Sequence, residues 1–153
     1  MFRIFLKLIV FMTLSVSVSA QYCNYNVSVN NFVSEIDTSE QSVAHSVTVK
    51  SYSNSSNCLN VRLYFSKGYA NSYNRAGYNG NKTVPYNIYK ESSLNTVLKD
   101  YGDATGSEYI DLSLDNSQRQ ATAEFYMKVV DLDSVFSNGP GWYNDLIQIK
   151  AYS

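Results

Sequence analysis

Two stretches decide the fold, Pro85-Tyr86-Asn87-Ile88-Tyr89-Lys90 and Gly139-Pro140-Gly141-Trp142-Tyr143-Asn144-Asp145, the second continuing into Leu146-Ile147-Gln148-Ile149-Lys150-Ala151-Tyr152. In the segment 146–152, Ile147, Ile149 and Ala151 alternate with polar residues, which predicts a strand with one buried face. The Gly-Pro-Gly before it is typical of a turn. The chain therefore closes on a turn and a half-buried strand.

The same alternation recurs along most of the chain between short clusters of Asn, Ser, Gly and Asp, whereas helical patterns are scarce. It predicts strands over residues 43–49, 59–65, 84–89, 109–114, 121–130 and 142–152. We expect the first two of these to pair across the Ser- and Asn-rich residues 51–57. Residues 67–82 are expected to form a loop ending in a turn at Asn79-Gly80-Asn81, and residues 131–141 a connection.

About seven short strands in one domain-sized segment predict an all-β fold, a Greek-key immunoglobulin-like β-sandwich. A closed barrel is the alternative, because alternation alone does not separate the two architectures. The domain is expected to span residues 21–153, a length that supports one core.

Residues 1–20 have the pattern of an export signal. Arg3 and Lys7 flank the start of an apolar run, and Val18 and Ala20 are the small residues expected before a cleavage point. Cleavage there would leave a mature chain beginning at Gln21. The run is shorter than the roughly 18 to 20 apolar residues that cross a bilayer, so no stable membrane span is expected in the mature chain.

Charge argues against nucleic acid as a partner. The chain has 12 basic and 13 acidic residues, and removal of Arg3 and Lys7 would leave 10 basic residues and a net charge of −3. Nucleic-acid binding needs clustered Lys and Arg to neutralise phosphates, and the sequence has no such cluster.

The two cysteines are expected to form one disulfide, Cys23 to Cys58, because an exported chain with an even cysteine count favours pairing. Such a bond would stabilise the fold by about 3 to 4 kcal/mol in the chain-entropy model. The absence of a Cys-x-x-Cys spacing disfavours a redox pair.

Catalytic and metal chemistry find little support. His45 is the one histidine and lies on the apolar side of a predicted strand, so we expect it to be packed and hydrogen-bonded rather than part of a triad or a zinc site. The acidic pairs Asp131/Asp133 and Asp100/Asp103 fall at predicted turns, where aspartate commonly binds nearby backbone. We expect no enzyme activity and no cofactor, and calcium binding by these aspartates is the alternative.

Tyrosine is unusually frequent, with 14 residues. Tyr69, Tyr73 and Tyr78 fall in the predicted Gly- and Asn-rich loop, and their side chains combine a large apolar area with one polar group. A loop that binds glycan is therefore an alternative function for the chain, as a self-complete secreted sandwich.

The order of motifs resembles the spore coat protein U family and the related subunits of archaic chaperone-usher pili. The resemblance rests on Tyr86-Asn87-Ile88-Tyr89, on Leu98-Lys99-Asp100-Tyr101-Gly102-Asp103, and on the Gly-x-Tyr-x-Asp pattern at 141–145 with the strand that follows. It covers residues 58–153. It implies a structural or adhesive subunit that crosses the periplasm to the cell surface or a pilus.

The resemblance also implies a sandwich that lacks one strand, which a periplasmic chaperone and then a neighbouring subunit would supply through donor-strand complementation. An outer-membrane usher and other pilus subunits would be further partners. The last strand, with Ile147, Ile149, Ala151 and Tyr152, would face the chaperone or partner strand.

The chain departs from fibre-forming subunits before its first cysteine. Cleavage after Ala20 would leave Gln21 and Tyr22 ahead of Cys23, too few residues for a donor strand of about five. The expectation is a subunit that accepts a strand without donating one, at a pilus end or outside a fibre. Cleavage further upstream would change this, because Leu14-Ser15-Val16-Ser17-Val18 alternates as a donor strand does.

Overall fold

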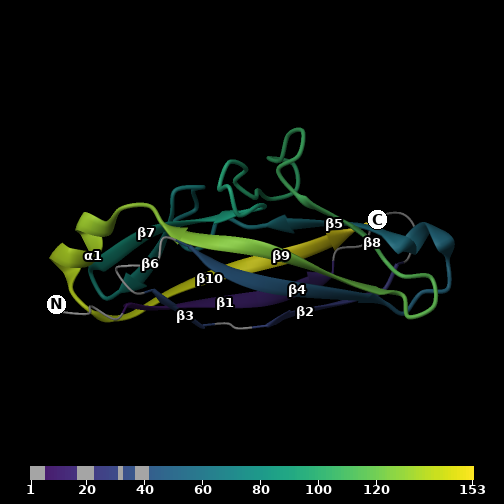
Figure 1. Ribbon diagram of the computed structural model, residues 1–153, viewed down its shortest axis with the longest axis horizontal. Helices are drawn as coiled ribbons and strands as arrows, with labels where there is room; N and C mark the ends of the chain where they lie inside the picture. Colours follow the sequence, from purple (N-terminus) through teal and green to yellow (C-terminus); the bar gives the residue numbers. More distant parts are fainter. Residues whose placement is uncertain (1–5, 17–22, 31–32, 37–41) are drawn as a thin grey trace.

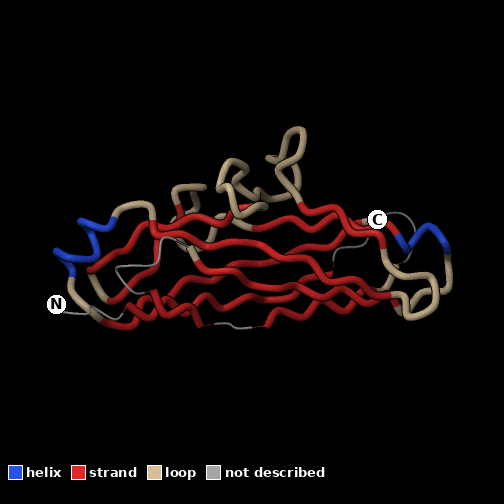
Figure 2. The backbone as a smooth tube through the Cα atoms, viewed as in Figure 1, coloured by secondary structure: helices blue, strands red, loops and turns tan. Residues whose placement is uncertain are grey.

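The computed structural model describes residues 6–16, 23–30, 33–36 and 42–153. Its elements lie along an elongated body whose strands follow the long axis (Figures 1 and 2). In chain order the described elements are β1 (Leu6–Val16), β2 (Tyr25–Asn30), β3 (Val33–Ile36), β4 (Val43–Ser51), the 3₁₀ turn η1 (Ser56–Leu59), β5 (Asn60–Phe65), β6 (Arg75–Asn79), β7 (Lys82–Tyr89), β8 (Ile110–Ser113), β9 (Gln120–Val129), α1 (Leu132–Asn138) and β10 (Gly141–Tyr152).

The strands form a β-sandwich, so the predicted all-β fold is confirmed. One layer has the antiparallel order β2-β4-β9-β7, and the other is built from β8, β5, β10, β1 and β3. β6 joins the layers, because it pairs with β7 along its length and meets β10 at Asn144. β1 runs parallel to β10, and the other pairings are antiparallel.

The core lies between the layers and follows from the alternation. Leu63 and Phe65 of β5 and Phe125 and Met127 of β9 are buried. The rings of Phe65 and Phe125 meet edge-on at 5.3 Å between centroids, which brings β5 and β9 into contact. Fully burying one such side chain stabilises a fold by about 1.5 to 3 kcal/mol.

Two sequence predictions were wrong, one about strand pairing and one about a loop. The strands predicted at 43–49 and 59–65 do not pair across residues 51–57, because β4 pairs with β2 and β9 while β5 pairs with β10 and β8. The segment 67–82 is not all loop, since Arg75–Asn79 is β6. The predicted turn at Asn79-Gly80-Asn81 is confirmed, and Gly80 has the positive φ of +57° that favours glycine there.

The number of strands and the segment 131–141 also differ from the sequence predictions. The described residues hold ten strands rather than about seven, and the connection at 131–141 contains α1. Residues 94–103 contribute one isolated bridge, between Val97 and Tyr89.

The predicted disulfide between Cys23 and Cys58 is present. His45 is buried and stacks on Phe125 at 5.4 Å between ring centroids, as its position on the apolar side of the strand predicted.

The predicted export signal falls partly on β1, and residues 1–5 and 17–20 lie outside the described residues. Cleavage after Ala20 stays a prediction. Among the residues that the structure describes, no helix has the length and apolar character to span a membrane.

Candidate partner-strand site

The last strand, β10, has two edges with different partners. One edge is shared between β5, at Ile149–Tyr152, and β6, at Asn144. Among the described strands, β1 is the partner of the other edge along Gly141–Ala151, in a parallel register that runs from Leu6 opposite Gly141 to Val16 opposite Ala151. Figure 1 shows β1 lying alongside β10. We call the edge paired with β1 the partner-strand edge.

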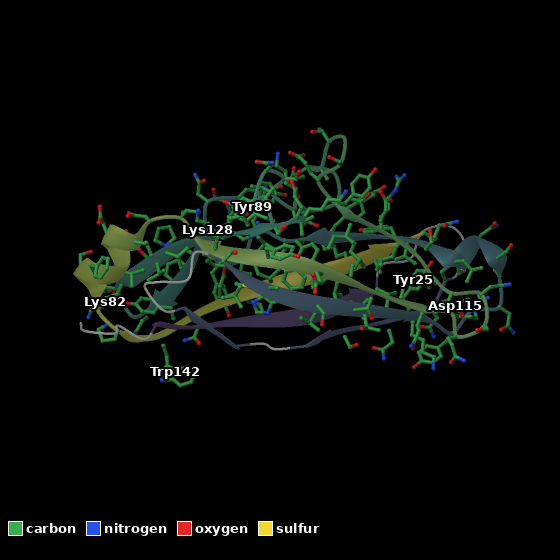
Figure 3. The ribbon with its side chains drawn as sticks, viewed as in Figure 1. Tyr25, Lys82, Tyr89, Asp115, Lys128 and Trp142 are labelled. Carbon is green, nitrogen blue, oxygen red and sulfur yellow. A yellow bond between two sulfur atoms is a disulfide. The ribbon has the colours of Figure 1, made fainter. Side chains whose placement is uncertain are left out.

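One face of β10 is buried beside this edge. Its buried residues are Tyr143, Asp145, Ile147, Ile149 and Ala151. The opposite face is more open, and Trp142 is 50% exposed near the α1 end of the molecule (Figure 3). The predicted single face formed by Ile147, Ile149 and Ala151 is therefore present, although their contact with a partner stays a prediction.

Tyr152 ends β10 in an aromatic cluster. Its ring stacks on Tyr101 at 4.2 Å and meets Tyr64 edge-on at 5.5 Å, and Tyr109 lies beside Tyr64. Tyr64 is buried, whereas Tyr101 is exposed. The cluster joins the end of β10 to β5 and to the loop that contains Tyr101.

Asp145 is the polar exception on the buried face. One carboxylate oxygen accepts hydrogen bonds from the backbone N–H of Tyr69 at 2.7 Å and of Leu146 at 2.8 Å, and the other accepts from the Tyr86 hydroxyl at 2.6 Å. Gly68 approaches so closely that a Cβ there would lie 2.6 Å from Oδ1 of Asp145. These bonds hold a carboxylate inside the sandwich, where an unpaired one would be costly.

Arg75 is the second buried charge. Its guanidinium donates to the carbonyl oxygens of Ser66, Phe65 and Leu98 at 2.8 to 3.1 Å and to Asn87 Oδ1 at 2.7 Å. Burial lowers the pKa of Arg75, an effect opposed by nearby tyrosines and by the Asp145 charge. The pKa of Tyr86 is raised well above its ordinary value, first by burial and then by Asp145.

These contacts bring the three motifs behind the family resemblance into one cluster. Tyr86 and Asn87 come from the first motif, Leu98 from the second and Asp145 from the third. Arg75 links the first two motifs and Tyr86 links the first to the third. The sequence reasoning missed Arg75. The predicted turn at 79–81 could have found it, because a hairpin turn before the strand at 84–89 needs a strand on its other side. We call Arg75, Tyr86, Asn87 and Asp145 the buried polar cluster.

Tyr73 lies beside this cluster and supports the loop above it. Its hydroxyl donates to Asp103 at 2.8 Å and accepts from the backbone N–H of Asp100 at 2.8 Å. Burial, together with the nearby Asp103, raises the pKa of Tyr73 to about 12. Hydrogen bonds from Lys67 and Tyr73 lower the pKa of Asp103.

The other two tyrosines of the predicted ligand loop are placed differently. Tyr69 is 61% exposed and lines an open cavity of about 340 Å³ with Ser66, Lys67, Gly68, Asn71, Asp100, Asp103, Leu146 and Gln148. Tyr78 lies in β6, where it pairs with Thr83 and Asn144. Ligand binding by these tyrosines stays a prediction.

Aspartates of both predicted acidic pairs are engaged within the fold, Asp131 with its own helix and Asp100 with the distant Lys150. Asp131 caps α1 by accepting from the backbone N–H of Asp133 at 3.0 Å, and the Ser134 hydroxyl lowers the pKa of Asp131. Asp100 accepts from Lys150 Nζ at 3.0 Å with both carboxylate oxygens. Within the described ranges, no group of three or more His, Cys, Asp or Glu side chains could hold a metal ion.

Fold and site together define an all-β sandwich domain whose final strand has one edge fixed within the domain and one edge closed by a separate N-terminal strand. The model of the Spore Coat Protein U domain family matches residues 10–150, so the chain belongs to that family. No curated protein sequence matches the chain. Membership of this family indicates a pilus-type surface subunit with a structural role.

Proposed function

We propose that this chain is a structural or adhesive subunit of a bacterial surface appendage, assembled by donor-strand complementation. The observation that carries the proposal is the pairing of the partner-strand edge. Its partner within the chain is Leu6–Val16, which lies inside the predicted export signal. Removal of residues 1–20 would therefore take away the strand that closes β10.

A β10 left without β1 would be poorly suited to a free monomer. Unpaired N–H and C=O groups along Gly141–Ala151 form a template for pairing with another chain. Beside them lie Ile147, Ile149 and Ala151, which are fully buried in the closed sandwich. A strand from a partner would satisfy both needs, through backbone hydrogen bonds and alternating apolar side chains.

The partners would be those of a chaperone-usher pathway. A periplasmic chaperone would cover the edge after export, an outer-membrane usher would handle the subunit, and a strand from a neighbouring subunit would replace the chaperone at the cell surface. Cleavage after Ala20 leaves only Gln21 and Tyr22 before Cys23. The subunit would then accept a strand without donating one, which suits a terminal position in a pilus.

The test is to produce the chain from Gln21 in the periplasm, alone and with a candidate chaperone, and to measure soluble yield and thermal unfolding. We expect aggregation of the chain alone and a soluble complex with the chaperone, because the open edge exposes apolar surface and unpaired backbone. A cooperatively unfolding, stable monomer without a partner would contradict donor-strand complementation.

A second candidate is glycan binding at the open cavity beside Tyr69. The combination of an exposed tyrosine ring with Asp, Asn, Gln and Lys side chains is chemically suited to sugars. Glycan-array binding that is lost in Tyr69→Ala but retained in Tyr52→Ala, at another exposed tyrosine, would support it. Tyr73→Ala is a poor probe, since it would remove hydrogen bonds that support the loop.

A further inference from the structure

The register between β1 and β10 sorts the N-terminal segment into two sets of residues. The first set lies opposite the buried face of β10: Leu8 opposite Tyr143, Val10 opposite Asp145, Met12 opposite Ile147, Leu14 opposite Ile149 and Val16 opposite Ala151. All five N-terminal residues are apolar. Residues that face each other across neighbouring strands lie on the same side of a sheet, so this set belongs to the core side by its register.

The second set lies opposite the outer face of β10 and becomes polar toward its end. Lys7 is opposite Trp142, Thr13 is opposite Gln148 and Ser15 is opposite Lys150. Between them, Ile9 and Phe11 are apolar although they belong to the outer set. Continuous apolar sequence at 8–12 suits an export signal, whereas the alternation at 12–16 suits a strand. The segment therefore carries both patterns.

β1 also completes a second strand. Leu6–Ile9 pair antiparallel with Val33–Ile36 of β3, and β1 is the one described strand that pairs with β3. A single segment thus satisfies the edges of both β10 and β3. Removal of β1 would leave both β10 and β3 without this partner.

We propose that residues 8–16 are a donor strand held in cis, which closes the sandwich while the export signal is attached, so that removal of the signal is the event that opens the partner-strand edge. This rests on the proposed function, because it assumes that the open edge is then filled by a partner. It adds the identity of a strand that fits, its direction parallel to β10, and the step that controls access.

The central test compares two substitutions at neighbouring positions of the full chain, produced in an oxidising cytoplasm so that residues 1–20 are retained and the disulfide forms. Met12→Asp places a charge at a position in register with buried Ile147. Thr13→Asp places the same charge in register with exposed Gln148. Thermal unfolding and size-exclusion chromatography report stability and association.

We expect Thr13→Asp to remain monomeric with an unchanged Tm. Met12→Asp should lose the cis strand, so its Tm should fall to that of the chain from Gln21 and it should associate like that shorter chain. Equal behaviour of the two variants would overturn the proposal, because an attached but undocked segment would not distinguish residue 12 from residue 13.

A second measurement does not depend on folding of the variants. A fluorescently labelled peptide of residues 6–16, extended by lysines for solubility, is added to the chain from Gln21 after refolding from denaturant. The wild-type peptide should bind, raise the soluble fraction and raise the Tm, whereas the Met12→Asp peptide should do none of these. Failure of the wild-type peptide to bind would contradict the proposal.

Direction is tested with cysteine pairs in the full chain. The parallel register places Thr13 opposite Gln148. A strand reversed about the Phe11–Leu146 pair would place Thr13 opposite Asn144 instead. We expect a disulfide in the Thr13→Cys, Gln148→Cys variant and none in the Thr13→Cys, Asn144→Cys variant, because bridging needs Cα atoms about 4.4 to 6.8 Å apart. The opposite result would overturn the parallel docking.

Failure of this proposal is distinguishable from failure of the proposed function. A chain from Gln21 that is stable and monomeric alone would contradict donor-strand complementation itself. Another outcome is that the chain from Gln21 needs a chaperone but does not bind the 6–16 peptide, and that Met12→Asp leaves the Tm of the full chain unchanged. That outcome would contradict the cis strand and leave donor-strand complementation intact.

Discussion

The two edges of β10 are held by different chemistry. The edge toward β5 and β6 lies next to the buried polar cluster, in which Asp145 and Arg75 each make several directed hydrogen bonds to neighbouring segments. The partner-strand edge is paired through the backbone with β1, whose residues in register with the buried face of β10 are all apolar. The first requires particular side chains at particular positions, whereas many alternating sequences would satisfy the second.

Under the proposed function, this difference explains how one strand can be anchored at one edge and available to a partner strand at the other. Buried charged groups tolerate few alternatives, because a partner removed leaves the other charge uncompensated. Alternating apolar residues on a strand are interchangeable at small cost when volume is kept. We therefore expect substitutions at the two edges to differ in kind as well as in size.

The largest effect is expected at Asp145. Asp145→Ala leaves the Tyr86 hydroxyl and the Tyr69 N–H without their acceptor and removes a charge that stabilises buried Arg75. The full chain should lose about 3 to 5 kcal/mol of stability, measured by denaturant unfolding. Gln148→Ala, at an exposed position of the same strand, is the control and should change stability by less than about 0.5 kcal/mol. A similar loss in both variants would contradict the anchoring role of the cluster.

Removal of the disulfide should have a slightly smaller effect, outside both edges. The bond between Cys23 and Cys58 spans 35 residues of sequence and ties the chain ahead of β2 to η1. The double substitution Cys23→Ser, Cys58→Ser should cost about 3 to 4 kcal/mol in denaturant unfolding.

The same disulfide loss should add to the loss in Asp145→Ala without coupling, because the two sites share no bonding partner. Strong coupling in a double-mutant cycle would mean that the disulfide helps to position β10. That result would mean that the stability of the edge beside the buried polar cluster depends on the disulfide.

Tyr86→Phe tests the buried polar cluster by removing a single oxygen atom. The substitution keeps the buried ring and removes the hydroxyl that donates to Asp145 at 2.6 Å. Loss of a hydrogen bond to a buried charged group should cost about 1 to 3 kcal/mol. Thermal unfolding of the full chain measures it. Tyr86→Phe should have no further effect in an Asp145→Ala background, and an additive loss there would mean that the hydroxyl acts through another group.

The smallest expected effect is the alkaline pH dependence from Tyr73. Its pKa is about 12 in the folded chain against an ordinary 10.0, so the folded state keeps a proton that the unfolded state loses. The stability contributed is fully present below pH 10 and is lost as pH rises toward about 12. Tyr73→Phe should show a shallower fall in Tm over this range than the wild type, each relative to its value at neutral pH. An unchanged slope would contradict this assignment.

Sequence patterns predicted the fold where alternation and turn residues agree. The strands near 43–49, 59–65, 84–89, 109–114, 121–130 and 142–152 follow directly from period-two alternation, and the disulfide from an even cysteine count. The pairing of 43–49 with 59–65 failed, because proximity in sequence favours a hairpin only when the connection is a short turn. Residues 51–57 instead pass through η1 and carry the chain from one layer to the other.

The candidate site was predictable in part. The buried face of β10 follows from Ile147, Ile149 and Ala151, but the position of Asp145 within the core does not, since an aspartate after a turn usually faces solvent. The role of Arg75 was not predicted, because the Gly- and Asn-rich composition of residues 67–82 is typical of a loop and gave no indication of β6. In β1 only the alternation from Leu14 onward predicts a strand, because the continuous apolar residues before it have the same composition in an export signal and in a buried strand.

The parallel pairing of β1 with β10 has a consequence for folding kinetics. It joins the first and last described strands, and β10 finds its other partners, β5 and β6, only after long intervening segments. Contacts so distant in sequence form late, and chains dominated by them fold slowly. We therefore expect β10 to be among the last strands to pair during folding. Under the proposed function, a partner strand would raise the yield of folded chain by shortening the time that β10 stays uncovered.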